Sequence, residues 1–245
     1  MRETRPLMGM PITVEFADAA TQQDVDGVFD FFGAIDRRFS TYKSDSEISR
    51  INRGELKLKD ASEDMRLVFA MCEETKRETD GYFDIVTRDG SYDPSGLVKG
   101  WAIQKAAEQL WARGFRNFFV DAGGDIQTSG RNAKGEKWAV GIRNPFDASQ
   151  TVKVLRVSGQ GVATSGTQVR GQHIYDPHDK TKTFEDIVSL TVVGPNIYDA
   201  DRFATAAFAM GKGGIAFIER LPELEGYSID RNGIATMTGG FEAYV

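Results

Sequence analysis

An apolar strand followed directly by a helix of small apolar residues constrains this chain more than any other feature. Residues 187–193 are mostly apolar and predict a strand, and the glycine, proline and asparagine that follow predict a turn. Residues 199–211 then place acidic residues first, small and apolar residues next, and a glycine last. This order predicts a short helix that is buried in the protein.

Two side chains near the start of that helix could bind a metal. Asp201 and Thr205 are four residues apart, so they share one helix face in the first turn. A carboxylate and a hydroxyl are hard oxygen ligands of the kind that magnesium prefers. Alternatively, Asp199 or Asp201 could simply cap the helix and offset its dipole, because aspartate is a common cap. Taken alone, this stretch leaves both interpretations open.

The composition is that of a globular protein and excludes several classes. The chain has 245 residues, 40% of them hydrophobic, which allows a large core in one domain or in a domain with a subdomain. A net charge of −6 argues against a general nucleic-acid binder, and no apolar run is long enough to span a membrane. Cys72 is the only cysteine, which excludes an intrachain disulfide and a cysteine-cluster metal site.

The N-terminal residues lack the apolar core of a signal peptide. A cytoplasmic protein is therefore expected, the alternative being an exported protein whose leader has been trimmed.

Apolar periodicity predicts further helices and a series of short strands. Helices are expected at 22–38 and 62–79, in the segment after 100 that ends at Gly114, and at 214–221. Strands are expected at 12–16, 117–121, 138–143, 151–157, 161–167, 226–230, 234–237 and 241–245. The close succession of strands around 138–157 indicates hairpins, and hence mostly antiparallel pairing. No repeat or long linker marks a domain boundary.

A turn containing glycine opens the helix that follows residue 93. Such a turn offers backbone groups to an anionic or metal-bound ligand, and Lys99 at its entrance could meet a phosphate or a carboxylate. It could equally be an ordinary helix start with a solvated lysine. Neither GxxxxGK[ST] nor GxGxxG occurs here, so the segment is not a known nucleotide fingerprint.

The two histidines and one loop tyrosine each admit two interpretations. His173 and His178 are five residues apart with a proline between them, which argues against a helical zinc pair. A histidine near the Thr-Ser-Gly turn at 164–166 could accept a proton at neutral pH, or could only form hydrogen bonds. Tyr42 could stack on an aromatic ligand, or could be a half-buried loop tyrosine.

Taken together, these segments resemble the ApbE family of FAD:protein FMN transferases, in a short form. No single block is very specific, but the blocks occur in the family's order and cover nearly the whole chain. They are Met8-Gly9, Phe39-Ser40-Thr41-Tyr42, Gly81-Tyr82-Phe83-Asp84, 93–100, Gly123-Gly124-Asp125-Ile126, Thr164-Ser165-Gly166, 173–177 and 200–205.

The resemblance implies a fold and an activity. The fold would be α+β and akin to the T-fold, with a mostly antiparallel sheet packed with helices, in one domain over 1–245 that could include a small lobe. The activity would be magnesium-dependent transfer of FMN from FAD to a threonine hydroxyl of an acceptor protein with an Asp/Ser-Gly-Ala/Ser-Thr motif, releasing AMP. The alternatives are a magnesium-dependent FAD pyrophosphatase that gives FMN and AMP, and a non-catalytic FAD-binding protein.

The resemblance also implies roles for particular residues. Magnesium would be held by Asp201, Thr205 and the backbone carbonyl of Gly96, and His173 would deprotonate the acceptor threonine. FAD contacts would come from Met8, Tyr42, Tyr82, Phe83, Asp84, Asp93, Lys99 and Tyr175. One departure is that only residues 85–92 separate Asp84 from Asp93, where many relatives carry a much longer insertion. Part of the lobe that usually covers the flavin is therefore expected to be missing.

Overall fold

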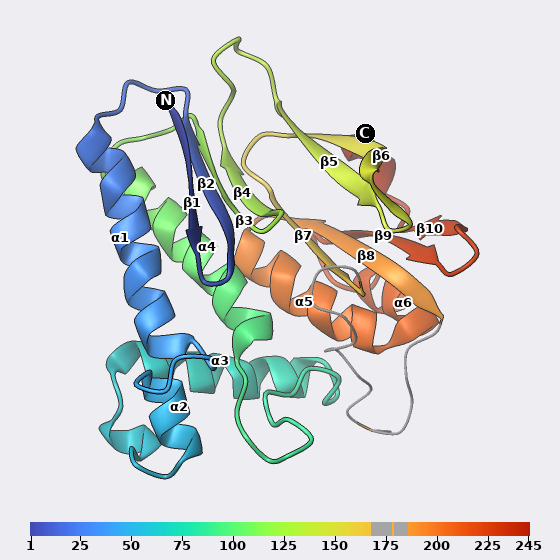
Figure 1. Cartoon of the computed structure of the whole chain (residues 1–245). Helices are drawn as coiled ribbons and strands as arrows, with labels where there is room; N and C mark the ends of the chain where they lie inside the picture. Colours follow the sequence, from blue (N-terminus) through green and yellow to red (C-terminus); the bar gives the residue numbers. More distant parts are fainter. Residues whose placement is uncertain (168–177, 179–185) are drawn as a thin grey trace.

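The computed structural model describes residues 1–167, 178 and 186–245, and its centre is a large antiparallel sheet (Figure 1). Within the described residues this sheet has eight strands, in the order β1-β2-β3-β4-β7-β8-β9-β10. They are β1 (Arg2–Leu7), β2 (Met10–Phe16), β3 (Phe118–Ala122), β4 (Asp125–Ser129), β7 (Gly161–Gly166), β8 (Ile187–Gly194), β9 (Glu225–Asp230) and β10 (Ala235–Met237). A separate antiparallel hairpin consists of β5 (Trp138–Asn144) and β6 (Asp147–Val157).

In the described residues three helices lie side by side along one face of the sheet, and three others pack near their ends (Figure 1). The three are α1 (Gln22–Phe39), α4 (Ser95–Ala112) and α5 (Ile197–Ala209); the others are α2 (Glu47–Asn52), α3 (Glu63–Glu78) and the short α6 (Gly214–Ile218) after α5. None of the helices in the described ranges has both the length and the apolar character of a membrane span.

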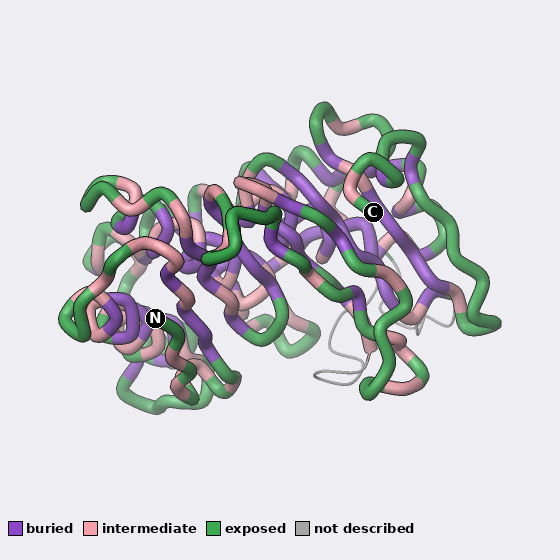
Figure 2. The backbone as a smooth tube through the Cα atoms, turned by 90° about the horizontal axis from the view of Figure 1, so that it is seen from above, coloured by how far each residue is buried: buried purple, intermediate pink, exposed green. Residues whose placement is uncertain are grey.

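The sheet separates two hydrophobic cores. The larger core lies between the helices and the sheet and includes Phe32, Val120 and Phe208. The smaller core lies between the other face of the sheet and the β5–β6 hairpin and includes Phe119 and Leu155. Phe119 and Val120 are neighbours in β3 whose side chains enter different cores, as the alternation of a strand requires. Figure 2 shows buried residues running along the central strands, with exposed residues at the loops.

This architecture confirms the predicted α+β class and the mostly antiparallel sheet, but β1, β4, α2 and the C-terminal 3-10 helix differ from the prediction. The sequence did not predict β1, whose residues alternate between exposed and intermediate burial with none fully buried. Residues 241–245 were predicted as a strand, but Phe241–Tyr244 form a short 3-10 helix. The ring of Phe241 is fully buried and stacks on Tyr227 at 5.3 Å, so burial of one ring, and not strand pairing, fixes this end.

Candidate active site

The start of α5 is capped by groups other than its aspartates. The side chain of Asn196 accepts a hydrogen bond from the Asp199 backbone N–H at 2.8 Å, and the Gln127 Oε1 atom accepts one from the Ile197 N–H at 2.8 Å. The interpretation of Asp201 as a helix cap is therefore wrong. Asp201 is only 2% exposed, and its carboxylate contacts α4 instead of the start of α5.

Helix α4 passes very close to Asp201. The Gly100 N–H donates a hydrogen bond to the Asp201 Oδ2 atom at 2.7 Å. A Cβ atom on Gly100 would lie 2.6 Å from the Asp201 Cβ atom and 2.9 Å from the Ile197 carbonyl oxygen, so no larger residue fits. Burial raises the pKa of Asp201 to about 7, against the opposing effect of the nearby Lys99 ammonium.

Lys99 lies between two buried carboxylates. Its Nζ atom is 3.5 Å from the Asp201 Oδ1 atom and forms an ion pair with the Asp125 Oδ2 atom. Asp125 is 3% exposed, and its Oδ1 atom accepts a hydrogen bond from the Thr164 N–H at 2.9 Å. The Lys99 side chain is 24% exposed, so the alternative of a solvated lysine is wrong.

Sequence reasoning assigned no role to Asp125. The signal that could have found it is an acidic residue directly after the paired glycines Gly123 and Gly124, where a strand begins close to a ligand site.

Thr205 meets α4 one turn away from Asp201. Its hydroxyl donates to the Gly96 carbonyl oxygen at 3.4 Å, so the crossing pairs Thr205 with Gly96 and Asp201 with Gly100. A carboxylate, a hydroxyl and a carbonyl thus face one another across two helices, which is the oxygen donor set that suits magnesium. No group of three or more His, Cys, Asp or Glu side chains gathers in the described part of the chain. An ion here would therefore complete its coordination with water or substrate oxygens.

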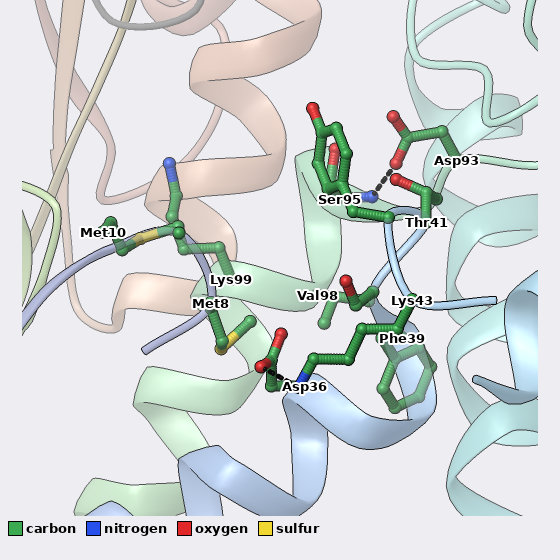
Figure 3. Close-up of a pocket in the computed structure, with 13 residues that line it drawn as sticks. Met8, Met10, Asp36, Phe39, Thr41, Lys43, Asp93, Ser95, Val98 and Lys99 are labelled. Atoms are coloured by element: carbon green, nitrogen blue, oxygen red, sulfur yellow. Dashed lines mark hydrogen bonds and ion pairs between the residues drawn. The ribbon is translucent and has the colours of Figure 1, made fainter. Parts of the chain in front are cut away.

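A cavity of about 310 Å³ opens beside this crossing (Figure 3). Four of the predicted FAD contacts line it: Met8, Tyr42, Asp93 and Lys99. Figure 3 shows Lys99 beside Met10 on one side of the cavity, with Asp93 and Thr41 on the other. Met8 reaches the cavity because it lies in the tight β1–β2 turn, where Met8 and Gly9 both have positive φ.

The polar groups of this cavity are held by local bonds. The Asp93 Oδ1 atom accepts a hydrogen bond from the Ser95 N–H at 3.0 Å at the start of α4. The Lys43 ammonium forms an ion pair with Asp36 at 2.6 Å. Tyr42 is 95% exposed, so the interpretation of a half-buried loop tyrosine is wrong, and its ring is open to a ligand.

Three other predicted contacts lie outside this cavity. Tyr82, Phe83 and Asp84 are not among the residues that line this cavity. Phe83 is 3% exposed and packs under Gly96, and Asp84 forms an ion pair with Lys76 at 2.7 Å. The Tyr82 ring meets the His178 ring edge-on at 4.7 Å. The predicted base His173 and the predicted FAD contact Tyr175 lie outside the described residues.

Comparisons with known proteins find several curated relatives. The FAD:protein FMN transferase of Vibrio cholerae is 31% identical over 129 residues, which cover 49% of this chain and 39% of the relative. The enzyme of the same name from Escherichia coli K12 is 28% identical over 150 residues, covering 58% and 43%. The matched part of the chain thus spans about two fifths of the length of these curated relatives.

The fold and the family are shown by two further matches. The structure of the flavin transferase ApbE from Vibrio cholerae superimposes with a TM-score of 0.86 at 22% identity, covering 100% of this chain and 99% of that one, which shows a shared fold. The sequence model of the ApbE family matches residues 8–91 and 86–228, and the two matches meet in the short segment after Asp84. The chain therefore belongs to the ApbE family.

Proposed function

We propose that this protein catalyses the magnesium-dependent transfer of FMN from FAD to a threonine hydroxyl of an acceptor protein, releasing AMP. The observation that carries the proposal is the crossing of α4 and α5, which gathers Asp201, Thr205 and the Gly96 carbonyl beside Lys99. This oxygen cluster adjoins a cavity lined by an exposed tyrosine and two methionines. Membership of a family whose named relatives are FAD:protein FMN transferases supports flavin transfer.

The residues fit a magnesium ion. The Asp201 carboxylate is buried and burial raises its pKa, so a bound cation would stabilise its charged form. Thr205 and Gly96 offer neutral oxygens at the same crossing. When bound, the ion would neutralise charge on the phosphoryl oxygens and on the leaving AMP.

The chain's own residues would bind and orient the nucleotide. The Lys99 ammonium, held by the buried Asp125 carboxylate, can donate to phosphate oxygens at the edge of the cavity. The Gly100 N–H fixes one oxygen of Asp201 and so directs the other toward the Lys99 side. The exposed ring of Tyr42 offers a face on which an aromatic ring of FAD can stack.

The transfer breaks the phosphoanhydride bond of FAD and forms a phosphoester bond to threonine. The threonine oxygen bonds to the FMN phosphorus, and the bond from that phosphorus to the oxygen bridging the two phosphates breaks. AMP leaves with the bridging oxygen, and the hydroxyl proton passes to a base, for which we propose His173. General-base assistance of this kind contributes about 10²–10⁴-fold to a rate.

The test incubates the protein with FAD, magnesium and a peptide that contains Asp-Gly-Ala-Thr, followed by mass spectrometry. The peptide should gain the mass of FMN less one water, and AMP should appear in equal amount. An unmodified peptide, with transfer by a longer relative under the same conditions, would refute the proposal. FMN and AMP formed without any peptide would indicate the pyrophosphatase, and unchanged FAD would indicate a non-catalytic flavin-binding protein.

Two variants test the assigned roles. Asp201→Asn should abolish turnover, whereas Asp199→Asn, two residues away and bonded to Arg202, should retain it. His173→Ala should slow transfer more than it weakens FAD binding. Full turnover by Asp201→Asn would show that the metal assignment is wrong.

A further inference from the structure

A second cavity, of about 430 Å³, adjoins the candidate active site. The ion pair between Lys99 and Asp125 joins the two cavities, because Lys99 lines the first and Asp125 lines the second. The second cavity lies on the hairpin side of the sheet, between the β3–β4 turn and β5. A group that enters the second cavity would therefore meet this ion pair at Asp125.

The unpaired edge of β5 forms one wall of this cavity. Ala139, Gly141 and Arg143 share one face of β5, and Trp138 and Val140 belong to the other face, yet all five residues line the cavity. A cavity against one face of a strand would touch alternate residues, so this one runs along the strand edge. In the described residues β5 pairs with β6 alone, which leaves its backbone groups on the cavity side available to another strand.

The opposite wall is open to close approach by a backbone. It consists of the β3–β4 turn, where Gly124 has a φ of +104° and no atom lies within 4 Å of the position that a side chain would occupy. The Gly124 N–H is held by the Asp121 Oδ1 atom at 2.8 Å, so the turn is fixed. An extended chain can thus pass between β5 and this turn on its way to Asp125.

Two arginines and two aspartates line this cavity, and the arginines offer its positive charge to an acidic partner. Arg143 is exposed and lines the cavity, and its positive charge acts on the Asp121 carboxylate. Arg2 also lines the cavity, but it forms an ion pair with Glu15 at 3.4 Å. Arg143 is therefore the cation best placed to meet an acidic side chain of a bound segment.

We propose that the second cavity is the acceptor groove: an extended segment of the acceptor protein pairs with β5 as an added strand. An acidic residue of the segment meets Arg143, and its threonine lies at the Asp125 end. This inference rests on the proposed function and identifies the surface that binds the acceptor protein. The covalent step is unchanged: the threonine oxygen bonds to the FMN phosphorus, AMP leaves with the bridging oxygen, and the hydroxyl proton passes to His173.

A non-reacting peptide separates binding from transfer. A fluorescein-labelled peptide with Asp-Gly-Ala-Val, in which valine replaces threonine, is titrated with the protein in the presence of FAD and magnesium and followed by anisotropy. Arg143→Glu should weaken binding at least tenfold. Arg156→Glu, an equally exposed arginine on the neighbouring strand β6 that does not line the cavity, should change binding less than twofold. A peptide with Ser-Gly-Ala-Val should show a smaller effect of Arg143→Glu.

Backbone pairing is tested with the wild-type protein, which removes any concern over folding of a variant. Single N-methylation along the peptide should weaken binding at alternate positions, because alternate N–H groups of an added strand face its neighbour. Tolerance of N-methylation at every position would overturn the strand pairing, and equal binding by Arg143→Glu would overturn the site.

Flavin fluorescence without peptide provides the last control. If Arg143→Glu weakens FAD binding by the same factor as peptide binding, the cavity is a flavin subsite and the proposal is wrong. Since the valine peptide cannot be modified, its binding can be measured independently of the transferase activity. Transfer that proceeds normally in Arg143→Glu would refute the groove and leave the proposed function intact.

Discussion

Replacing Gly100 by alanine tests whether the close crossing of α4 and α5 builds the site. The new Cβ atom would lie 2.6 Å from the Asp201 Cβ atom, whereas carbon atoms pack at about 3.5–4.0 Å. The new Cβ atom cannot shift in the other direction, because the Ile197 carbonyl oxygen lies 2.9 Å from it. Because Asn196 and Gln127 hold the first turn of α5, the helices must separate by about 1 Å to relieve the contact.

The expected cost has three parts. Overpacking a well-packed site costs about 1–3 kcal/mol. Weakening the hydrogen bond from the Gly100 N–H to the Asp201 carboxylate costs about 1.5–3 kcal/mol, while alanine in a helix recovers about 1 kcal/mol. The free energy of unfolding should therefore fall by about 1.5–5 kcal/mol, measured by urea denaturation of the metal-free protein.

The same change in α1 provides the matched control. A Cβ atom on Gly27 would meet one Arg113 guanidinium nitrogen at 3.6 Å, an ordinary contact, so Gly27→Ala should raise the free energy of unfolding by about 0.5–1 kcal/mol. Calorimetry should also show that Gly100→Ala binds magnesium at least tenfold more weakly than Gly27→Ala. Equal stability and equal magnesium affinity of the two variants would refute the reasoning.

Three further outcomes are expected. Burial raises the pKa of Asp201 from 3.8 to about 7, so the metal-free protein should lose stability as the pH rises from 4 to 7, and Asp201→Asn should lose less in urea denaturation over this range. Arg202→Ala removes a buried guanidinium that pairs with Asp199 and Glu78, and should lower the free energy of unfolding by about 1–3 kcal/mol; a melting temperature equal to wild type would contradict this. Burial raises the pKa of the Cys72 thiol, so Ellman's reagent should label it only on unfolding, and rapid labelling of the native protein would show it accessible.

The longer helices could be predicted from the sequence because their apolar residues recur at helical spacing, whereas the short α2 was not predicted. In α1 the apolar residues that recur at helical spacing are all buried, and they are Val25, Val28, Phe29, Phe32, Ile35 and Phe39. Strand β1 has no such signal. It is an edge strand whose residues alternate between exposed and intermediate burial, because one neighbour and a partly solvated face require few apolar side chains. Hydrophobic periodicity therefore does not predict edge strands of this kind.

The sequence predicted several residues of the site, but it did not predict which of them contact one another. The i, i+4 spacing of Asp201 and Thr205 places both on one face, but a spacing within one helix cannot say which element lies opposite. The Lys99–Asp125 pair joins α4 to β4, and which polar groups meet across two elements depends on packing that no local pattern encodes.

A second spacing in the sequence bears on which helix lies opposite Asp201 and Thr205. Gly96 and Gly100 are also four residues apart, and glycine in a helix costs about 1 kcal/mol relative to alanine, so two on one face need a compensating reason. The structure supplies it: each glycine receives one member of the Asp201–Thr205 pair. When one helix carries small residues and another carries oxygen ligands at the same spacing, we therefore predict that the two helices cross. The crossing would have an oxygen-lined site between the helices.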